Sequence, residues 1–290
     1  MAPPQQPHAR TRRTRAPVSR RTLARQTRAL VAALVVARAN ALSRVAPLPP
    51  LPPQPLLDGD LQPTHGFSAA ANWLVPGRVM LGANPTKGRG SALNRVEAIC
   101  GAGCTAFVSL QEEGEERDSG YQVEACACTD DASFARWPIQ DLRPASSLDY
   151  LDEIVCDLAE RVRAGETLYL HCFAGRGRTG LVACCLLGEL YPSVDADEAL
   201  ARVGAYYKLR ALYSGNSRAA DGYSPETEPQ RDQVREFYER RAAPATETPA
   251  AETLAATPST ETPTDALPFD GMSCVAFKLD QLQSSTPRSL

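Results

Sequence analysis

Hydrophobic and polar residues alternate in short blocks through the middle of the chain, and the blocks predict strands and helices in turn. Apolar runs rich in β-branched and aromatic residues predict buried strands at 72–75, 78–82, 105–110 and 167–170, with a further strand near 134. Apolar positions at helical spacing predict helices over 93–100, 148–162, 181–187, 200–209 and 231–241. Strands that alternate with helices are typical of an α/β fold, in which helices flank a central, mostly parallel sheet.

Polar residues and glycines mark the ends of several of these helices. Ser146 with Asp149 predicts the start of the helix over 148–162 in the manner of a capping box. Asp195 with Glu198 predicts the start of the helix over 200–209.

The segment His171-Cys172-Phe173-Ala174-Gly175-Arg176-Gly177-Arg178-Thr179-Gly180 lies between the last predicted strand and a helix that is apolar on all sides. The chain therefore passes from a strand through a glycine-rich turn into a helix. Backbone amides in such a turn, together with the positive end of the helix, bind a dianion. Gly175 and Gly177 let the backbone curl with its amides inward.

Cys172 and Arg178 stand near the two ends of this turn, and both suit phosphoryl chemistry. The positive field of the helix favours a thiolate at Cys172, the nucleophilic form of cysteine. The Arg178 guanidinium offers paired donors that match two phosphoryl oxygens. We expect the Thr179 hydroxyl to donate to the sulfur, and His171 to hold the loop by hydrogen bonding rather than to act as a base. A lone cysteine is more often buried core, but that interpretation requires the whole segment to be a coincidence.

The segment resembles the signature His-Cys-x-x-Gly-x-x-Arg-Ser/Thr-Gly of the cysteine-based protein tyrosine and dual-specificity phosphatases, and it matches at every fixed position. The resemblance implies their fold and a cysteinyl-phosphate mechanism without metal or other cofactor. It also implies a phosphate-binding loop made of Phe173, Ala174, Gly175, Arg176, Gly177 and Arg178. The resemblance extends over residues 65–241, which we predict to be the phosphatase domain.

Two further residues resemble catalytic parts of that family. Asp141 lies on a loop between Pro138 and Pro144, like the mobile loop that carries the family's general acid. A carboxyl group there protonates the leaving oxygen, although Asp141 also suits a plain turn. Gln230, near the start of the last predicted helix, resembles the glutamine that orients the hydrolytic water. Glu226 stands where a first glutamine often occurs, and Gln230 is otherwise an exposed residue of the first turn.

The charged loop after the strand at 105–110 holds a further candidate. By the same resemblance, Glu112 or Glu113 is the acidic residue that ties to Arg178. The alternative is that both are solvated surface residues.

Several cysteines lie close together in the sequence, at Cys100, Cys104, Cys126 and Cys128. They lack the Cys-x-x-Cys spacing of zinc sites, and the chain has 3 histidines. We therefore predict no metal site. One of these thiols could instead form a protective disulfide with Cys172 on oxidation.

The two ends of the chain differ in composition from the middle. Residues 1–57 contain no acidic residue and many arginines, which is typical of a plastid or mitochondrial transit peptide. The alternatives for this segment are a nuclear-localisation or RNA-binding patch and an export signal. The alternative localisation to an organelle is the cytoplasm or nucleus. The proline-rich run 47–55 predicts a stiff polyproline II linker. Residues 242–290 are of low complexity and predict a disordered tail.

The predicted function is that of a protein phosphatase, acting on phosphotyrosine and also on phosphoserine or phosphothreonine if it is a dual-specificity enzyme. We expect a monomer with phosphoprotein substrates, no nucleic-acid partner and no transmembrane segment; the run 30–37 is too short to cross a bilayer. Arg176 adds positive charge to the loop, as in relatives that prefer phosphoinositides, but Phe173 stands where those often carry lysine. A phosphoinositide or other non-protein phosphatase and a non-catalytic phosphate-binding module are the alternatives.

Overall fold

A computed structural model describes residues 47–86, 92–115, 121–213, 217–243 and 272–273. The basic segment 1–46, on which the targeting prediction rests, and most of the predicted tail lie outside the described residues. Among the described helices, none is long and apolar enough to cross a membrane.

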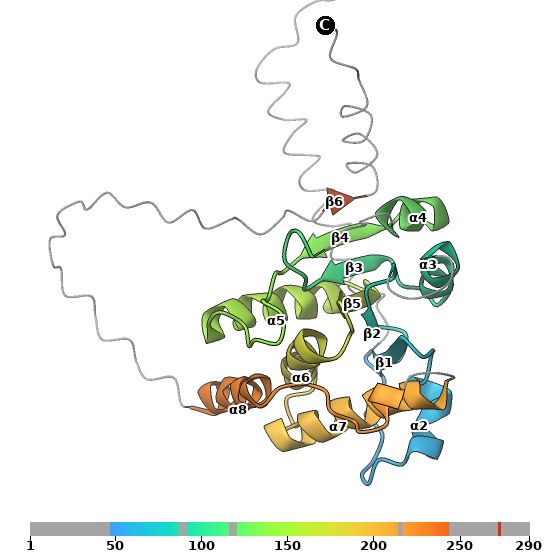
Figure 1. Ribbon diagram of the computed structural model, residues 1–290. Helices are drawn as coiled ribbons and strands as arrows, with labels where there is room; N and C mark the ends of the chain where they lie inside the picture. The colour runs from blue at the N-terminus through green and yellow to red at the C-terminus, as the bar shows by residue number, and fades with distance from the viewer. Residues whose placement is uncertain (1–46, 87–91, 116–120, 214–216, 244–271, 274–290) are drawn as a thin grey trace, which may run out of the picture. The chain divides into compact units, whose positions relative to one another are not determined.

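The described strands form one mostly parallel sheet, as predicted (Figure 1). Its order is β1-β2-β5-β3-β4-β6, and β2, β5, β3 and β4 run parallel while β1 and β6 pair antiparallel at the two edges. The strands are β1 (Ala71–Val75), β2 (Val79–Ala83), β3 (Ala106–Ser109), β4 (Ser133–Arg136), β5 (Leu168–Cys172) and β6 (Met272–Ser273).

Helices cover both faces of this sheet (Figure 1). On one face lie α2 (Asp58–His65), α5 (Leu148–Arg163), α6 (Gly177–Leu190), α7 (Ala196–Lys208) and α8 (Glu228–Ala242). The other face carries α3 (Ala92–Gly101) and α4 (Tyr121–Cys128). Two short 3-10 turns, η1 (Leu209–Leu212) and η2 (Ser217–Ala219), follow α7.

Two hydrophobic clusters fill the space on either side of the sheet. Because successive side chains of a strand point to opposite faces, Val108 of β3 packs towards α5 and α6, while Phe107 packs with the rings under α3 and α4. The same alternation in β5 sends Cys172 to the cluster of α5 and α6 and Tyr169 to the aromatic cluster. The last residue of β5 therefore faces the helix that follows it.

The predicted elements differ from the observed ones at a few places. The N-cap of α5 is Ser147, whose hydroxyl accepts from Tyr150 N–H at 3.1 Å, and not Ser146 as predicted. Asp195 caps α7 as predicted, accepting from Glu198 N–H at 2.8 Å. Helices α2 and α4 were not predicted, because both are short and their apolar residues lack a clear helical period.

The proline-rich segment packs on the domain, so the prediction that it is a linker is wrong for residues 47–57. Pro49 and Pro52 offer their carbonyls to Tyr191 Oη and to the Arg202 guanidinium, each at 2.8 Å. Three leucines of the segment pack against the core, namely Leu48, Leu51 and Leu56. The folded unit therefore begins well before residue 65.

We expect a chain shortened to residues 58–290 to be less stable than one shortened to residues 47–290. Each half-buried leucine that is lost contributes on the order of 1 kcal/mol, so the free energy of unfolding should fall by about 2 kcal/mol or more. Urea denaturation of both chains measures the difference. Equal midpoints would contradict the structural role of residues 47–57.

Candidate active site

The predicted phosphate-binding loop lies at the carboxyl edge of the parallel strands. Cys172 ends β5 and pairs in register with Ala83 at the end of β2, and α6 begins at Gly177. Ligands of parallel α/β sheets bind outside the carboxyl ends of the strands. The first turn of α6 also leaves its backbone N–H groups without partners inside the helix, which favours an anion there.

The loop carbonyls are hydrogen-bonded from outside the loop. The donors are the N–H of Asn84 to Phe173 (3.3 Å), the guanidinium of Arg210 to Gly175 (3.0 Å) and the hydroxyl of Ser224 to Arg176 (2.8 Å). Carbonyls held in this way point away from the centre of the loop. A concave loop whose carbonyls point outward presents its amides to an anion.

Gly175 is required by this geometry. Its φ of 66° lies in the left-handed region that glycine adopts without strain. A side chain at this position would also collide with the backbone of Gly82. The loop can therefore approach β2 closely only with glycine here.

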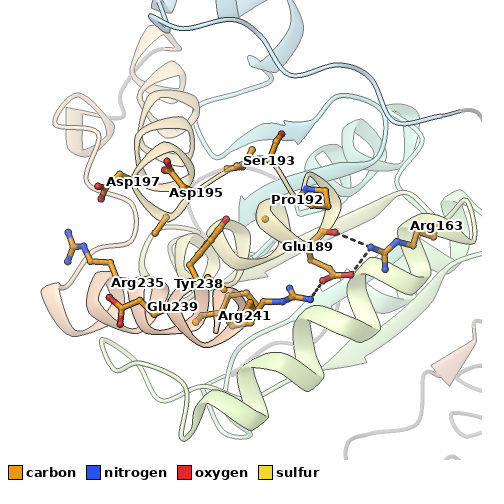
Figure 2. A pocket seen from close by; sticks show the side chains of 15 residues that line it. Arg163, Glu189, Pro192, Ser193, Asp195, Asp197, Arg235, Tyr238, Glu239 and Arg241 are labelled. Atoms are coloured by element: carbon orange, nitrogen blue, oxygen red, sulfur yellow. Dashed lines mark hydrogen bonds and ion pairs between the residues drawn. The ribbon is translucent and has the colours of Figure 1, made fainter. Parts of the chain in front are cut away.

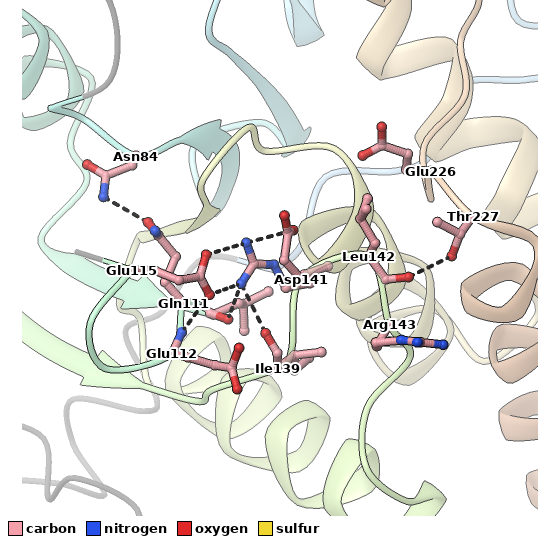
Figure 3. Close-up of polar contacts among 12 residues, drawn as sticks. Asn84, Gln111, Glu112, Glu115, Ile139, Asp141, Leu142, Arg143, Glu226 and Thr227 are labelled. Carbon is pink, nitrogen blue, oxygen red and sulfur yellow. Dashed lines mark hydrogen bonds and ion pairs between the residues drawn. The ribbon is translucent and has the colours of Figure 1, made fainter. Parts of the chain in front are cut away.

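Arg178 is buried, and its guanidinium contacts the carboxylates of Glu115 and Asp141, both of which Figure 3 shows. Glu115 accepts from Nη1 and Nη2 at 2.5 and 2.9 Å, and Asp141 Oδ1 lies 2.9 Å from Nη2. The carbonyl of Ile139 accepts from Nη1 at 3.0 Å. Nε is buried and has no hydrogen-bond partner among the described residues, so it is the donor available to a phosphoryl oxygen.

The acidic partner of Arg178 is Glu115, and the prediction of Glu112 or Glu113 is wrong. Glu112 contributes its backbone N–H, which donates to Glu115 Oε1 at 2.9 Å. Burial alone would raise the pKa of the Glu115 carboxyl, but the hydrogen bonds from Arg178 and Glu112 outweigh it and lower the pKa. Glu115 therefore stays ionised against the buried guanidinium.

Asp141 is brought to the site by the loop that follows β4, as predicted. Its side chain is 60% exposed and reaches Arg178 from the solvent side. The next residue, Leu142, has a φ of 62°, and its carbonyl accepts from Thr227 Oγ1 at 3.3 Å (Figure 3). The Asp141 loop is thus tied to the segment that precedes α8.

Gln230 is fully buried, so the alternative of an exposed first-turn residue is wrong. Its Oε1 accepts from the N–H groups of Glu226 and Thr227, both at 3.2 Å, and its Nε2 donates to the carbonyl of Arg143 at 3.0 Å. The side chain therefore joins the start of α8 to the Asp141 loop. The water-orienting role of Gln230 stays a prediction.

His171 and Thr179 are both buried, His171 next to Cys172 in the chain and Thr179 in the first turn of α6. His171 Nε2 lies 3.0 Å from the hydroxyl of Tyr121, and burial lowers the pKa of His171 to about 3. A neutral, hydrogen-bonded ring agrees with the expected supporting role. The Thr179 hydroxyl has no hydrogen-bond partner among the described residues, so the expected bond to the Cys172 sulfur is absent in this structure.

Arg176 is paired with acidic residues rather than directed into the loop. Its guanidinium contacts Asp221 at 3.2 Å and Glu226 at 3.5 Å. Its Nε also donates to the carbonyl of Tyr223 at 2.7 Å. The prediction that the Arg176 side chain adds free positive charge to the phosphate-binding loop is therefore wrong.

Cys172 is a free thiol, and the predicted disulfide with a neighbouring cysteine is absent in this structure. Cys126 is disulfide-bonded, whereas Cys100, Cys104 and Cys128 are free. Within the described ranges, no cluster of three or more His, Cys, Asp or Glu side chains could hold a metal ion.

A separate cavity of about 890 Å³ lies between the end of α6, the start of α7 and α8 (Figure 2). It is bordered by Glu189, which pairs with Arg163 at 2.6 Å and also with Arg241. Neither Cys172 nor Arg178 lines it. The phosphate-binding loop, and not this cavity, is therefore the candidate active site.

Sequence reasoning missed Glu115 and Arg210. Glu115 stands in a run of acidic residues, where no local signal separates the partner of Arg178 from its neighbours. Arg210 follows an amphipathic helix, where a basic residue usually ends the helix at the surface. The one available signal was that, apart from Lys208, the neighbours of Arg210 from Ala205 to Tyr213 are apolar or aromatic.

Residues 68–221 match the family model described as the Swiss Army Knife protein, DSP-PTPase phosphatase domain. Among solved structures, the chain is similar to Tk-PTP in its active form at 24% identity over 59% of this chain and 97% of that chain, with a TM-score of 0.45. It is also similar to a kinase-associated phosphatase whose catalytic-site cysteine is replaced by serine, at 23% identity over 57% and 88% of the two chains, with a TM-score of 0.46. PTPMT1 in complex with PI(5)P matches at 21% identity over 58% and 96%, with a TM-score of 0.42.

We expect the substitution Glu115→Ala to lower the free energy of unfolding by about 2 kcal/mol, because it leaves a buried guanidinium short of its main partner. Urea denaturation measures this change. The matched control is Glu112→Ala, which removes an exposed carboxylate and should change the free energy by less than about 0.5 kcal/mol. Equal losses in the two variants would contradict the assignment of Glu115.

We also expect stability to fall in acid because of the buried histidines. The native ring of His171 titrates at about 3 and that of His65 at about 4, whereas an unfolded histidine titrates near 6.5. The unfolded state therefore binds protons that the native state does not, and stability is lost as pH falls from 6.5 towards 4. Each histidine contributes a slope of about 1.4 kcal/mol per pH unit.

Urea denaturation of the full chain at pH 7 and pH 5 tests this dependence. The variant His65→Gln should show a smaller difference between the two pH values, since one of the two buried rings is gone. A free energy of unfolding that is unchanged between pH 7 and pH 5 would refute the prediction.

Proposed function

The chain belongs to the family of DSP-PTPase phosphatase domains, and on that basis we propose that it is a protein phosphatase that works through a cysteinyl-phosphate intermediate. The observation that carries the proposal is the loop from Cys172 to Arg178, with its carbonyls hydrogen-bonded from outside and the Arg178 Nε without a partner among the described residues. This arrangement suits a phosphoryl dianion directly in front of a sulfur nucleophile.

The first half of the reaction forms the phosphoenzyme. The Cys172 thiolate attacks phosphorus in line, an S–P bond forms, and the P–O bond to the leaving group breaks. Asp141 gives its proton to the leaving oxygen. The loop amides and Arg178 stabilise the negative charge on the equatorial oxygens.

The second half regenerates the enzyme. Water attacks phosphorus, the S–P bond breaks, and the electron pair returns to Cys172 as the thiolate. The Asp141 carboxylate accepts a proton from the water, which restores the acid. Gln230 would orient this water only if its side chain left one of its present partners, because its oxygen accepts from two backbone amides.

The charge of the loop rim favours phosphoprotein over phosphoinositide substrates. Asp221 and Glu226 neutralise Arg176, so that this cation is not free to bind a second phosphate of a polyanionic lipid headgroup. Three exposed apolar or aromatic side chains lie beside the site, namely Phe173, Leu142 and Tyr223. An apolar rim suits the ring of a phosphotyrosine residue.

We expect the full chain to hydrolyse a small aryl phosphate in the presence of a chelator, and Cys172→Ser to lose this activity. Asp141→Asn should reduce kcat by about 100-fold, within the range of general-acid catalysis. The control variant Cys156→Ser removes an exposed cysteine far along α5 and should keep full activity. Retained phosphate-analogue binding without any hydrolysis by wild type would instead favour a phosphate-binding module.

The substrate class is tested by comparing a phosphotyrosine peptide with PI(5)P under the same conditions. We expect a higher kcat/KM for the peptide. The double variant Asp221→Asn, Glu226→Gln releases Arg176 and should raise the relative rate on the lipid. A wild-type preference for PI(5)P would overturn the protein-phosphatase assignment while leaving the phosphatase mechanism intact.

A further inference from the structure

Arg210 is a second buried arginine behind the phosphate-binding loop, and it lies outside the signature segment. It is 1% exposed and donates to three oxygens: Asn72 Oδ1 at 2.7 Å, the Leu81 carbonyl at 2.9 Å and the Gly175 carbonyl at 3.0 Å. Its guanidinium carbon also lies 4.8 Å from the centre of the Tyr207 ring. These contacts hold the guanidinium in one position, directly behind Gly175.

The charge of Arg210 has no carboxylate partner among the described residues. All three of its hydrogen-bond acceptors are uncharged, whereas Arg178 has Glu115 and Asp141. A buried charge without a counterion is costly, and proteins rarely keep one. Burial accordingly lowers the pKa of Arg210, although a guanidinium stays protonated at neutral pH.

The titratable groups that interact electrostatically with Arg210 are Tyr207, Tyr169 and Cys172. Cys172 interacts electrostatically with Arg210 and with Arg178, and Tyr169 is the further titratable group common to Cys172 and Arg210. Tyr169 and Tyr207 stay neutral, because burial raises the pKa of each above the ordinary value. His171, next to the nucleophile, is neutral as well. Arg178 and Arg210 are thus two cations that interact with Cys172 from two different elements, α6 and η1.

We propose that Arg210 is a positioning residue for the phosphatase reaction, which turns the Gly175 carbonyl away from the phosphoryl group and serves as the buried counter-charge of the Cys172 thiolate. The proposal rests on the proposed function. It explains why the fold keeps an unpaired cation in its interior, because the missing anion appears when Cys172 ionises. It also assigns separate tasks to the two arginines, since Arg178 faces the substrate and Arg210 supports the loop from behind.

The test measures the pH dependence of Cys172 alkylation by iodoacetamide in the full chain, followed on the Cys172 peptide by mass spectrometry. In Arg210→Met we expect the pH midpoint of alkylation to rise by about one unit, which is a tenfold loss of thiolate at low pH. Arg210→Lys keeps the charge and should shift the midpoint by less than half as much. The acid limb of kcat/KM for the aryl phosphate should move with the midpoint.

A second variant places a carboxylate beside Arg210 without removing it. Asn72→Asp is nearly isosteric, and the new carboxylate would pair with the Arg210 Nε and add a negative charge near the nucleophile. The alkylation midpoint should rise here too. This variant keeps the test decisive if Arg210→Met fails to fold.

The matched control is Arg202→Met, because Arg202 is buried on α7 but paired with Glu198 at 2.6 Å, away from the loop. It should lower stability and leave the alkylation midpoint unchanged. Midpoints within 0.2 units of wild type in folded Arg210→Met or in Asn72→Asp, or equal shifts in Arg210→Met and Arg210→Lys, would overturn the proposal. Alkylation needs no turnover, so a wild type that alkylates normally but hydrolyses no phosphate ester would refute the proposed function instead.

Discussion

The active-site loop depends on one constraint, which is that its carbonyls must point away from the place that an anion will occupy. The chain meets it with donors from three separate segments, since Asn84 follows β2, Arg210 lies in η1, and Ser224 precedes α8. None of these residues belongs to the loop. The end of β2 and the segment between α7 and α8 therefore position the donors that hold these carbonyls.

The two buried arginines near the loop differ in how their charge is balanced. Arg178 is compensated by Glu115 and Asp141, so it can be held in the resting enzyme at little cost. Arg210 has only neutral acceptors, and its charge adds to the positive field of the α6 N-terminus. In the proposed arrangement, the positive charge of Arg178 is balanced by carboxylates and that of Arg210 is not, so the remaining positive field acts on Cys172.

The strand–turn–helix around Cys172 was predictable because its chemistry lies within ten consecutive residues and its strand and helix have clear apolar patterns. Asp141 was predictable by its place between two prolines. Glu115 was not, because the choice among neighbouring acids is made by where the loop after β3 meets Arg178 in space. The packing of residues 47–57 was also missed, since proline-rich composition describes local stiffness and says nothing about the surface to which the segment binds.

The backbone conformation of Leu142 links the stability of the Asp141 loop to phosphate binding. Its left-handed backbone costs about 1 kcal/mol, and two contacts offset that cost: the ion pair of Asp141 with Arg178 and the hydrogen bond from Thr227 to the Leu142 carbonyl. A phosphoryl group that binds Arg178 Nη2 as well as Nε competes with Asp141 for the Nη2 donor. Phosphate affinity and loop conformation are therefore linked: the free energy that the ion pair contributes to this loop conformation is lost when a phosphoryl group displaces Asp141. In the proposed mechanism, the displaced carboxyl group is then free to act on the leaving group.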